Sequence, residues 1–191
     1  MAEHQPADVR RAQILTAALE CIGQRGFHAT TMDDIVRASG LSKGALYWHF
    51  SNKESLFFAL FEECEKAILH EWKDIPDAAT LDRLYAQGDI VLRHLLEQRA
   101  LLEAWGEFSN HPTMRDRMAA IYEQSRHLMA KTIRVGIKRG ELRKCDPHHL
   151  AATLTALIEG LLLQTLVDAD YDPLATWPTA WEVVVQGIQR R

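Results

Sequence analysis

The residues of this 191-residue sequence with the most useful chemistry lie between positions 30 and 53, where hydroxyl, ammonium and aromatic side chains stand close to glycines. Ser42 precedes a short helical pattern, and a hydroxyl together with free amides at a helix start binds anions such as a phosphate oxygen. Lys43 can reach a phosphate or donate to guanine O6 and N7, and Ala45 can touch a thymine methyl group. Gly44 has no side chain, so a base edge can come close to it. This combination predicts contact with double-stranded DNA.

Two short predicted helices position these groups. Thr31 and Asp34 have the spacing of a capping box, which predicts a helix over residues 32–38 that Gly40 ends. A second short helix follows over residues 43–49. Two short helices joined by a tight turn that contains glycine form a helix-turn-helix.

A longer helix over residues 7–24, closed by Gly26 in a left-handed conformation, is expected to complete this module. Its apolar face needs partners, and the two short helices supply them. The predicted core consists of Ile14, Ala18, Cys21, Ile22, Ile35, Leu41, Leu46 and Phe50.

Residues 30–53, with the letters TTMDDIVRASGLSKGALYWHFSNK, resemble the signature of TetR/AcrR transcriptional regulators nearly throughout. Aligned caps, glycines and a Tyr-x-His-Phe-x-x-Lys run rarely coincide by chance, and the resemblance extends to about residue 70. It implies a homodimeric repressor that binds a palindromic operator and is released by a small molecule. The DNA-binding residues that it implies are Thr30, Thr31, Ser42, Lys43, Gly44, Ala45, Tyr47, Trp48, His49 and Lys53.

The resemblance also implies which of these residues hold the DNA backbone. Tyr47, His49 and Lys53 would contact phosphates, while Thr30 and Thr31 would bind the backbone of the opposite strand. Such contacts set the register of the protein on the duplex.

Sequence reading is expected from Lys43, Gly44 and Ala45, with Tyr47 and Trp48 as further candidates. Trp48 can instead pack against a sugar or fill a gap beside the next helix. Helix capping alone would also explain the three hydroxyl residues that begin helices, which are Thr31, Ser42 and Ser51.

Helical periodicity continues along the rest of the chain, while alternating strand patterns and Asn-Gly or Asp-Gly hairpins are missing. Ser51 and Glu54 predict a capping box that opens a fourth helix ending near residues 72–75. Further helices are expected over residues 80–96, 99–109, 113–138, 147–167 and 173–189. The fold class is therefore all-α with about nine helices. A three-helix helix-turn-helix domain over residues 1–53 precedes a helical ligand-binding and dimerisation domain over 54–191.

Dimerisation is expected because one helix-turn-helix buries little DNA surface, so that tight binding requires two copies related by symmetry. The last two helices carry an apolar belt too wide for packing on one side. The resemblance implies that they form a four-helix bundle with their symmetry mates, and ordinary packing within one chain is the alternative. The expected interface residues are Leu154, Leu157, Leu161, Thr165, Trp181, Val184, Val185 and Ile188.

The middle helices combine aromatic and methionine side chains with a few polar groups, which suits a ligand pocket but is also common in a helical core. A looser resemblance to the BetI-like C-terminal group rests on residues 105–108 and 140–161. A small molecule in this pocket would pull on the fourth helix and weaken DNA binding. The candidate lining residues are Trp105, Phe108, Met118, Tyr122 and Gln164.

Composition limits the other possibilities. With 47% hydrophobic and 25% charged residues, the chain can bury a sizeable core. A net charge of −4 argues against non-specific coating of nucleic acid, and residues 1–53 hold six Lys/Arg against five Asp/Glu. Three widely spaced cysteines and the missing secretory pattern favour a reducing cytoplasm, and the apolar stretch 150–167 is interrupted and short for a bilayer span.

Three other classes of protein fit the sequence less well. An enzyme would need a phosphate-binding glycine loop, a nucleophile elbow or a zinc-protease pair; the sequence has none of these, and no cofactor is expected. Cys145, His148 and His149 are the donors of a possible metal or redox sensor, but the Asp-Pro pair at 146–147 reads more simply as a helix start. A pure protein-interaction module would not lose DNA binding in a Lys43→Ala variant.

Overall fold

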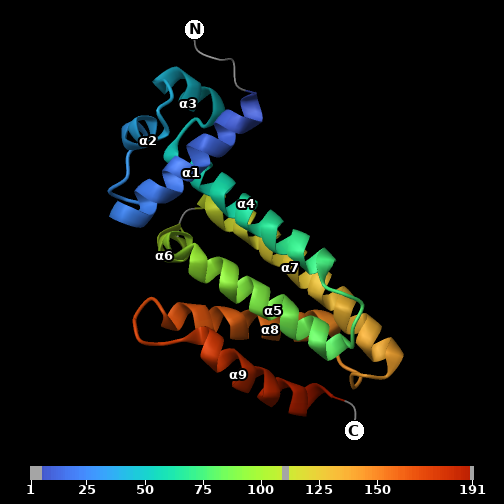
Figure 1. The fold of residues 1–191 in the computed structure, drawn as a ribbon. Coiled ribbons are helices and arrows are strands. Elements are labelled where there is room, and N and C mark those ends of the chain that lie inside the picture. The colour runs from blue at the N-terminus through green and yellow to red at the C-terminus, as the bar shows by residue number, and fades with distance from the viewer. Residues whose placement is uncertain (1–5, 109–111, 190–191) are drawn as a thin grey trace. The chain divides into compact units, whose positions relative to one another are not determined.

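The computed structural model describes residues 6–108 and 112–189, and within these the side chains of all residues except 105–108 and 112–114. Nine α-helices and one isolated antiparallel bridge, between Leu142 and Gln189, make up this part of the chain, which confirms the all-α class (Figure 1). The helices are α1 (Ala7–Arg25), α2 (Met32–Ser39), α3 (Lys43–His49), α4 (Lys53–Asp74), α5 (Thr80–Glu97), α6 (Arg99–Phe108), α7 (Pro112–Arg139), α8 (Pro147–Gln164) and α9 (Pro173–Ile188).

The chain divides into two compact units. The N-terminal unit runs to Lys66 and also includes Gln98–Trp105, whereas the C-terminal unit consists of Ala67–Glu97 and the chain from Gly106 onward. The sequence puts the boundary after residue 53, where α4 begins, while the compact units divide α4 itself after Lys66.

The first half of α4 belongs with the helix-turn-helix because its side chains pack there. The ring centroid of Phe57 lies 5.3 Å from that of Phe27, in the loop after α1. On the surface of the same helix, Glu63 accepts a hydrogen bond of 2.9 Å from Arg11 on α1. A boundary at the start of α4 would separate these partners.

Glycine and capping residues set the ends of the first helices as the sequence predicts. Gly26 and Gly40 follow α1 and α2 with φ angles of 79° and 67°, in the region that favours glycine. The Thr31 hydroxyl oxygen accepts from the Asp34 amide at 3.1 Å, and the Asp34 carboxylate accepts from the Thr31 amide at 2.9 Å. The predicted capping box is therefore present.

The core of the N-terminal unit joins α1, α2 and α3 through the predicted apolar residues, except that Leu41 is only half-buried. Ile14, Ala18, Ile35 and Leu46 are completely buried, and Phe50 is nearly so. Burying aliphatic side chains of this size stabilises a fold by roughly 1.5–3 kcal/mol each. Because Leu46 points into this core, the opposite face of α3 is directed outward.

The predicted capping box of α4 is displaced by one residue. The sequence assigns it to Ser51 and Glu54, but the structure forms it from Asn52 and Ser55. The Ser55 amide donates to Asn52 Oδ1 at 2.7 Å, and the Asn52 amide donates to Ser55 Oγ at 3.3 Å. Asparagine caps a helix as well as serine does, and only the three-dimensional path of the chain selects between the two.

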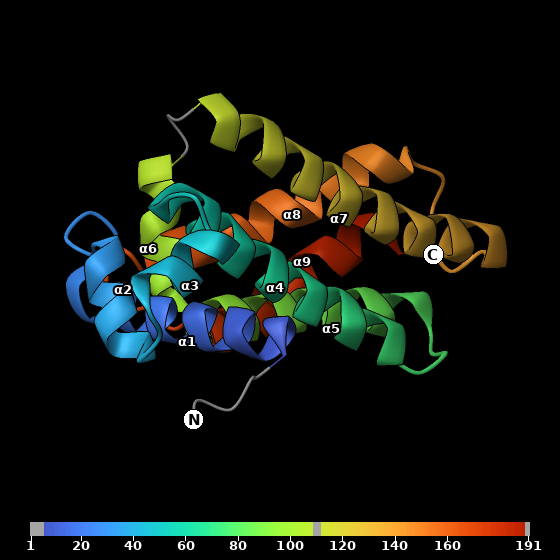
Figure 2. The same cartoon turned by 90° about the horizontal axis from the view of Figure 1, so that it is seen from above.

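In the C-terminal unit, α5 packs against α7, α8 and α9, and α7 packs against α8 (Figure 1, Figure 2). Gly88 on α5 lets α9 approach closely: a Cβ atom at Gly88 would lie 2.3 Å from Cζ2 of Trp177. The Trp177 ring also stacks on Tyr85, with centroids 5.6 Å apart. Both α8 and α9 begin with an aspartate cap followed by proline, and the sequence predicts this start for α8 from the Asp-Pro pair at 146–147.

The apolar helix α8 ends at Gln164, three residues earlier than predicted. The Thr165 hydroxyl donates to the Leu162 carbonyl at 2.7 Å, and the chain then continues as a turn. Within the described residues, none of the helices combines the length and the apolar character that a membrane span requires.

Candidate DNA-binding site

The outward face of α3 carries most of the residues that the sequence predicts to contact DNA. The Ser42 hydroxyl oxygen caps the helix by accepting from the Ala45 amide at 3.2 Å. A Cβ atom added to Gly44 would meet nothing within 4 Å, so the space above this residue is open to another molecule. The exposed residues of this face are Ser42, Lys43, Gly44, Tyr47 and Trp48.

Trp48 is exposed over 74% of its surface. This exposure excludes the predicted alternative that the side chain fills a gap beside α4, and it leaves the indole open to a sugar or a base. The His49 ring meets the Trp48 ring edge-on, with centroids 4.5 Å apart. Burial of His49 and the nearby charges of Arg11 and Arg10 lower its pKa. A ring N–H of the imidazole can donate a hydrogen bond to a phosphate oxygen.

Lys43 pairs with Asp33, a residue that sequence reasoning did not single out. The Lys43 ammonium lies 2.8 Å from Asp33 Oδ1 and 5.9 Å from the centroid of the Tyr47 ring. The hydrogen bond and the charge of Asp33 raise the pKa of Lys43. No short-range spacing rule identifies such a pair, because its members lie on different helices and meet only when the turn between α2 and α3 forms.

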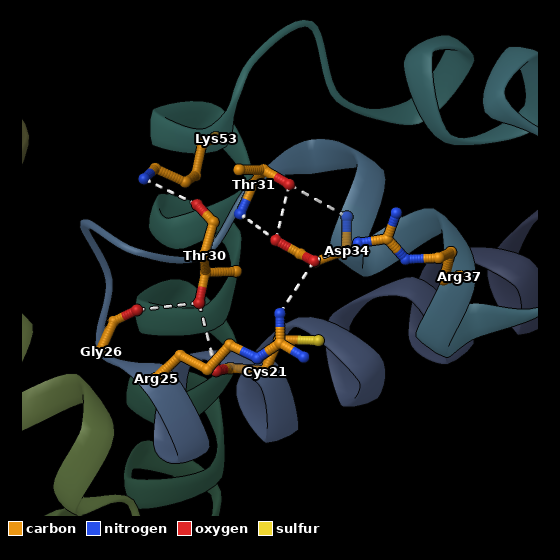
Figure 3. Close-up of polar contacts among 8 residues, drawn as sticks. All are labelled: Cys21, Arg25, Gly26, Thr30, Thr31, Asp34, Arg37 and Lys53. Carbon is orange, nitrogen blue, oxygen red and sulfur yellow. Dashed lines mark hydrogen bonds and ion pairs between the residues drawn. The ribbon is translucent and has the colours of Figure 1, made fainter.

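A buried carboxylate supports the start of α2 from inside (Figure 3). Asp34 accepts hydrogen bonds from the Thr31 hydroxyl at 2.6 Å and from Arg25 at 2.9 Å, and it also pairs with Arg37. The hydrogen bonds from Thr31, together with the two arginines, hold the pKa of Asp34 well below its usual range. Because the Thr31 hydroxyl gives its only proton to Asp34, Thr31 has none left for a phosphate. The first amides of α2 are the donors that remain there.

Thr30 does not lie on the predicted DNA-facing surface. The residue is fully buried, and its hydroxyl lies 2.8 Å from the Gly26 carbonyl oxygen and 3.1 Å from that of Cys21 (Figure 3). The prediction that this hydroxyl contacts the DNA backbone is therefore wrong. Thr30 instead joins the α1–α2 loop to the end of α1.

Lys53 is also used inside the protein. Its ammonium donates to three carbonyl oxygens of the α1–α2 loop, those of Phe27 at 2.7 Å, His28 at 3.2 Å and Thr30 at 2.9 Å. An ammonium has three protons, so this arrangement occupies all of them. In the structure Lys53 therefore binds the α1–α2 loop, whereas the sequence predicts that it contacts a phosphate. The reason is that three loop carbonyls converge where α4 begins.

The residues predicted to line an effector pocket fall into three groups. Trp105 and Phe108 lie in α6, but their side chains are outside the described part of the chain. Met118 is buried and Tyr122 half-buried on α7. Gln164 is exposed and its side-chain amide donates to the Gly160 carbonyl at 3.1 Å, so the structure does not bring it together with the other two.

Glu159 is a polar group beside Tyr122 that sequence reasoning did not select. Burial of its carboxyl raises the pKa of Glu159. Burial and the hydrogen bond to Glu159 raise the pKa of the Tyr122 phenol. The Arg126 guanidinium lies 5.8 Å from the centroid of the Tyr122 ring. A pairing between α7 and α8 of this kind has no local sequence signal.

The predicted dimer-interface residues are mostly turned into the subunit. Leu154, Leu161, Thr165, Trp181 and Ile188 are buried within the chain, and Leu157, Val184 and Val185 are half-buried. Packing within one chain, the alternative that the sequence left open, therefore accounts for the first five. The large apolar residues exposed on or just after these helices are Leu163, Val167 and Val183.

The Cys145–His149 segment is organised as a helix start. Asp146 accepts hydrogen bonds from the amides of His148 at 2.8 Å and His149 at 3.0 Å. A ring nitrogen of His148 lies 2.6 Å from the Arg134 guanidinium. Among the side chains that the structure describes, no group of three or more histidine, cysteine or acidic residues is arranged to hold a metal ion.

A short helix with an outward face of Lys43, Gly44, Tyr47 and Trp48, held on a three-helix scaffold, defines a helix-turn-helix DNA-binding protein. A family model described as "Bacterial regulatory proteins, tetR family" matches residues 14–60. A second, described as "BetI-type transcriptional repressor, C-terminal", matches residues 83–181. The chain belongs to the TetR family of bacterial transcriptional regulators.

Individual relatives agree with this assignment. The regulator TtgR of Pseudomonas putida is 27% identical, over 87% of this chain and 84% of TtgR. The regulator BetI of Escherichia coli O157:H7 is 29% identical, over 82% of each protein. A transcriptional regulator from Saccharomonospora viridis, solved in complex with choline, is 26% identical, with a TM-score of 0.80 over 96% of this chain and 100% of that chain. These relatives are regulators, in agreement with the prediction that the chain is not an enzyme.

Proposed function

We propose that this TetR-family regulator is a repressor that binds a palindromic operator as a homodimer and leaves it when a small molecule binds the C-terminal unit. The observation that carries the DNA half of the proposal is the open face of α3, where Gly44 has no neighbour within 4 Å and Trp48 is largely exposed. The match of residues 83–181 to the C-terminal part of BetI-type repressors supports repression as the mode of regulation.

The DNA contacts come from α3 and the start of α2. Lys43, Gly44, Ala45, Tyr47 and Trp48 face the bases and the adjacent backbone, while Ser42 and His49 donate hydrogen bonds to phosphates. The amide groups at the start of α2 bind the opposite strand. Thr30 and Lys53 support this surface from behind, by holding the α1–α2 loop.

The second copy docks on the outward faces of α8 and α9. Leu163 and Val183 are exposed on these helices, and Val167 follows α8 directly. Exposed apolar side chains of this size lose contact with water when two copies meet, which favours association. Symmetric pairing of two such helices gives a four-helix bundle.

The effector is recognised in part by Tyr122 and Glu159. Met118, one turn before Tyr122, supplies apolar surface, and a positively charged ligand would favour the ionised form of the Glu159 carboxyl, which burial alone disfavours. The relative from Saccharomonospora viridis holds choline, a small organic cation. Choline is therefore the first compound to test. Calorimetric titration should show binding to the wild type that Glu159→Gln weakens, and equal binding by both proteins would exclude this role.

Release follows from the continuity of α4. This helix begins in the N-terminal unit and ends in the C-terminal unit. A ligand that displaces the second half of α4 therefore moves the DNA-contacting helix α3 of each subunit. A ligand can shift this equilibrium only by binding the released form more tightly.

A reporter assay tests the whole proposal. The operator recovered by selection of random DNA is placed between a promoter and a reporter gene, and the regulator is expressed in the same cells. Repression is expected, and it should be relieved when an effector identified by calorimetry is added. A reporter that is activated, or one that stays repressed at saturating effector, would contradict the proposed function.

A further inference from the structure

The Asp33–Lys43 pair has a chemical consequence for DNA recognition. Lys43 is the first residue of α3, and Asp33 is the second residue of α2. The side chains are 58% and 62% exposed for Asp33 and Lys43, so the pair sits on the surface and not in the core. Its members meet at 2.8 Å, and the ring of Tyr47 lies 5.9 Å from the same ammonium. The Asp33 carboxylate on α2 and the Tyr47 ring on α3 thus fix the direction of the Lys43 side chain.

The pair is not needed to build the helices that carry it. Asp34, the neighbour of Asp33, forms the capping box and pairs with two arginines. Lys43 does not cap α3, because Ser42 does so. An acid in the first turn of a helix interacts favourably with the helix dipole, but an asparagine at that position leaves the capping box intact. A substitution at Asp33 therefore leaves both helix caps in place, and its effect on DNA binding can be measured.

Other cations of the helix-turn-helix are held by the protein. Arg11 pairs with Glu63, Arg25 and Arg37 pair with Asp34, and Lys53 donates to loop carbonyls. A carboxylate beside Lys43 offsets the positive charge closest to the predicted base contacts. A lysine without that carboxylate would bind any phosphate within reach, because phosphate contacts carry no sequence information.

We infer that Asp33 is a specificity-determining positioning residue: it stays paired with Lys43 on the operator, aims the ammonium at a guanine, and keeps it away from phosphates. The inference rests on the proposed DNA-binding function. An ammonium has three donors, so one can remain on Asp33 while the others reach guanine O6 and N7. Asp33 acts through Lys43, and its removal changes what the lysine binds.

The test compares the wild type with Asp33→Asn on the selected operator and on unrelated DNA, across a range of salt concentrations. Asp33→Asn should bind unrelated DNA about fivefold more tightly for each lysine released, with a salt slope steeper by about 0.9 per subunit. Its affinity for the operator should stay the same or fall. In a repeated selection, the preference for one guanine in each half-site should weaken, as it should in Lys43→Gln.

Two control variants separate this role from a simple change of charge. Glu20→Gln adds the same charge on α1, where Glu20 is exposed and has no ion pair among the described residues. It should leave the guanine preference and the salt slope unchanged. In Asp33→Asn/Lys43→Gln, the gain on unrelated DNA should disappear.

Several outcomes would overturn the inference. They are an equal gain from Glu20→Gln, a gain that persists without Lys43, an equal gain on operator and unrelated DNA, or an unchanged guanine preference in Asp33→Asn. A wild-type protein that selects no operator would instead overturn the proposed function, and this inference with it.

Discussion

At Gly44, helix stability favours alanine whereas DNA binding favours glycine. Alanine is favoured over glycine inside a helix by up to about 1 kcal/mol, and a methyl group at this position meets nothing in the protein. The same methyl group would stand between α3 and a base edge. We therefore expect Gly44→Ala to keep or raise the melting temperature and to weaken operator binding roughly tenfold or more, the size of one lost base contact.

A matched control for this variant is Gly23→Ala on α1, where a methyl group meets only Cβ of Ala100, at the ordinary contact distance of 3.9 Å. Gly23→Ala should leave operator binding unchanged, as measured by fluorescence anisotropy of labelled DNA. If Gly44→Ala binds the operator as tightly as the wild type, the close approach of DNA to α3 is wrong.

Asp34 predicts a pH dependence of the N-terminal unit. Its pKa is lowered by the hydrogen bonds from Thr31 and by two arginines. A group with a lowered pKa stabilises the fold fully above the ordinary aspartate pKa of about 3.9, and the effect is lost as pH falls toward the folded pKa. Asp34→Asn should therefore be less stable than the wild type at pH 7, and the difference should shrink below about pH 4.

Urea unfolding followed by circular dichroism at about pH 7, 5, 4 and 3 measures this difference down to the pH at which the carboxylate of the unfolded chain becomes protonated. Asparagine removes the charge and keeps the size of the side chain, so other acids titrate equally in both proteins. A difference that stays constant over this whole range would show that the Asp34 charge does not stabilise the unit.

Single residues were predicted well where the signal is local. The Thr31–Asp34 cap, the glycines after α1 and α2 and the exposed face of α3 depend on neighbours within a few positions. Thr30 and Lys53 could not be predicted in the same way. Their partners are carbonyls whose positions are set by tertiary packing, and Lys53 lies 23 to 26 positions away from the carbonyls that it binds.

At the scale of whole helices, the contact between α5 and α9 depends on Gly88. A Cβ atom there would lie 2.3 Å from the Trp177 ring, which is buried and stacked on Tyr85. A buried, stacked ring cannot move aside without disturbing the side chains packed around it. Gly88→Ala should destabilise the C-terminal unit by about 1–3 kcal/mol, as overpacking of a core does, even though alanine favours the helix.

Thermal unfolding monitored by circular dichroism checks this value. The control is Gly23→Ala in α1, where a methyl group meets only Cβ of Ala100, at the ordinary contact distance of 3.9 Å. This variant should be neutral or slightly stabilising. Equal stability of the two variants would mean that α5 and α9 are not packed as closely as the structure has them.

The helices themselves were largely predictable, because caps and apolar periodicity mark most of their ends. Two helix ends differ from the prediction. Asn52 replaces Ser51 as the cap of α4, and α8 ends at Gln164, three residues early. The close approach of α5 and α9 was not predictable, since one glycine in a helical pattern does not reveal which aromatic ring will lie against it.

For the whole molecule, the proposed dimer depends on exposed apolar residues of α8 and α9. Leu163→Glu combined with Val183→Glu places charges on both helices, and a charge at an apolar interface loses its hydration without gaining a partner. The double variant should be a monomer at concentrations where the wild type is a dimer, and it should lose operator binding.

Sedimentation equilibrium measures the two molecular masses directly. Val135→Glu serves as the control, because Val135 is an exposed apolar residue on α7. It should leave the dimer intact. A double variant that remains dimeric would move the interface away from these helices.

The sequence predicts that the last two helices carry apolar residues, but it could not separate residues that pack inside one chain from those that face a second copy. Leu161 and Leu163 lie close together on α8, and one is buried while the other is exposed. Both residues are apolar, and the helices that pack against α8 within the chain, which are α5, α7 and α9, decide which of the two is buried.

Operator binding by a symmetric dimer is measured by selecting bound sequences from a random pool of double-stranded DNA with the purified full chain. We expect one enriched motif with two-fold symmetry, whose half-sites lie about 10 base pairs apart or a multiple of that distance. A pool that stays random after selection, or an enriched motif without two-fold symmetry, would contradict operator binding by a symmetric dimer.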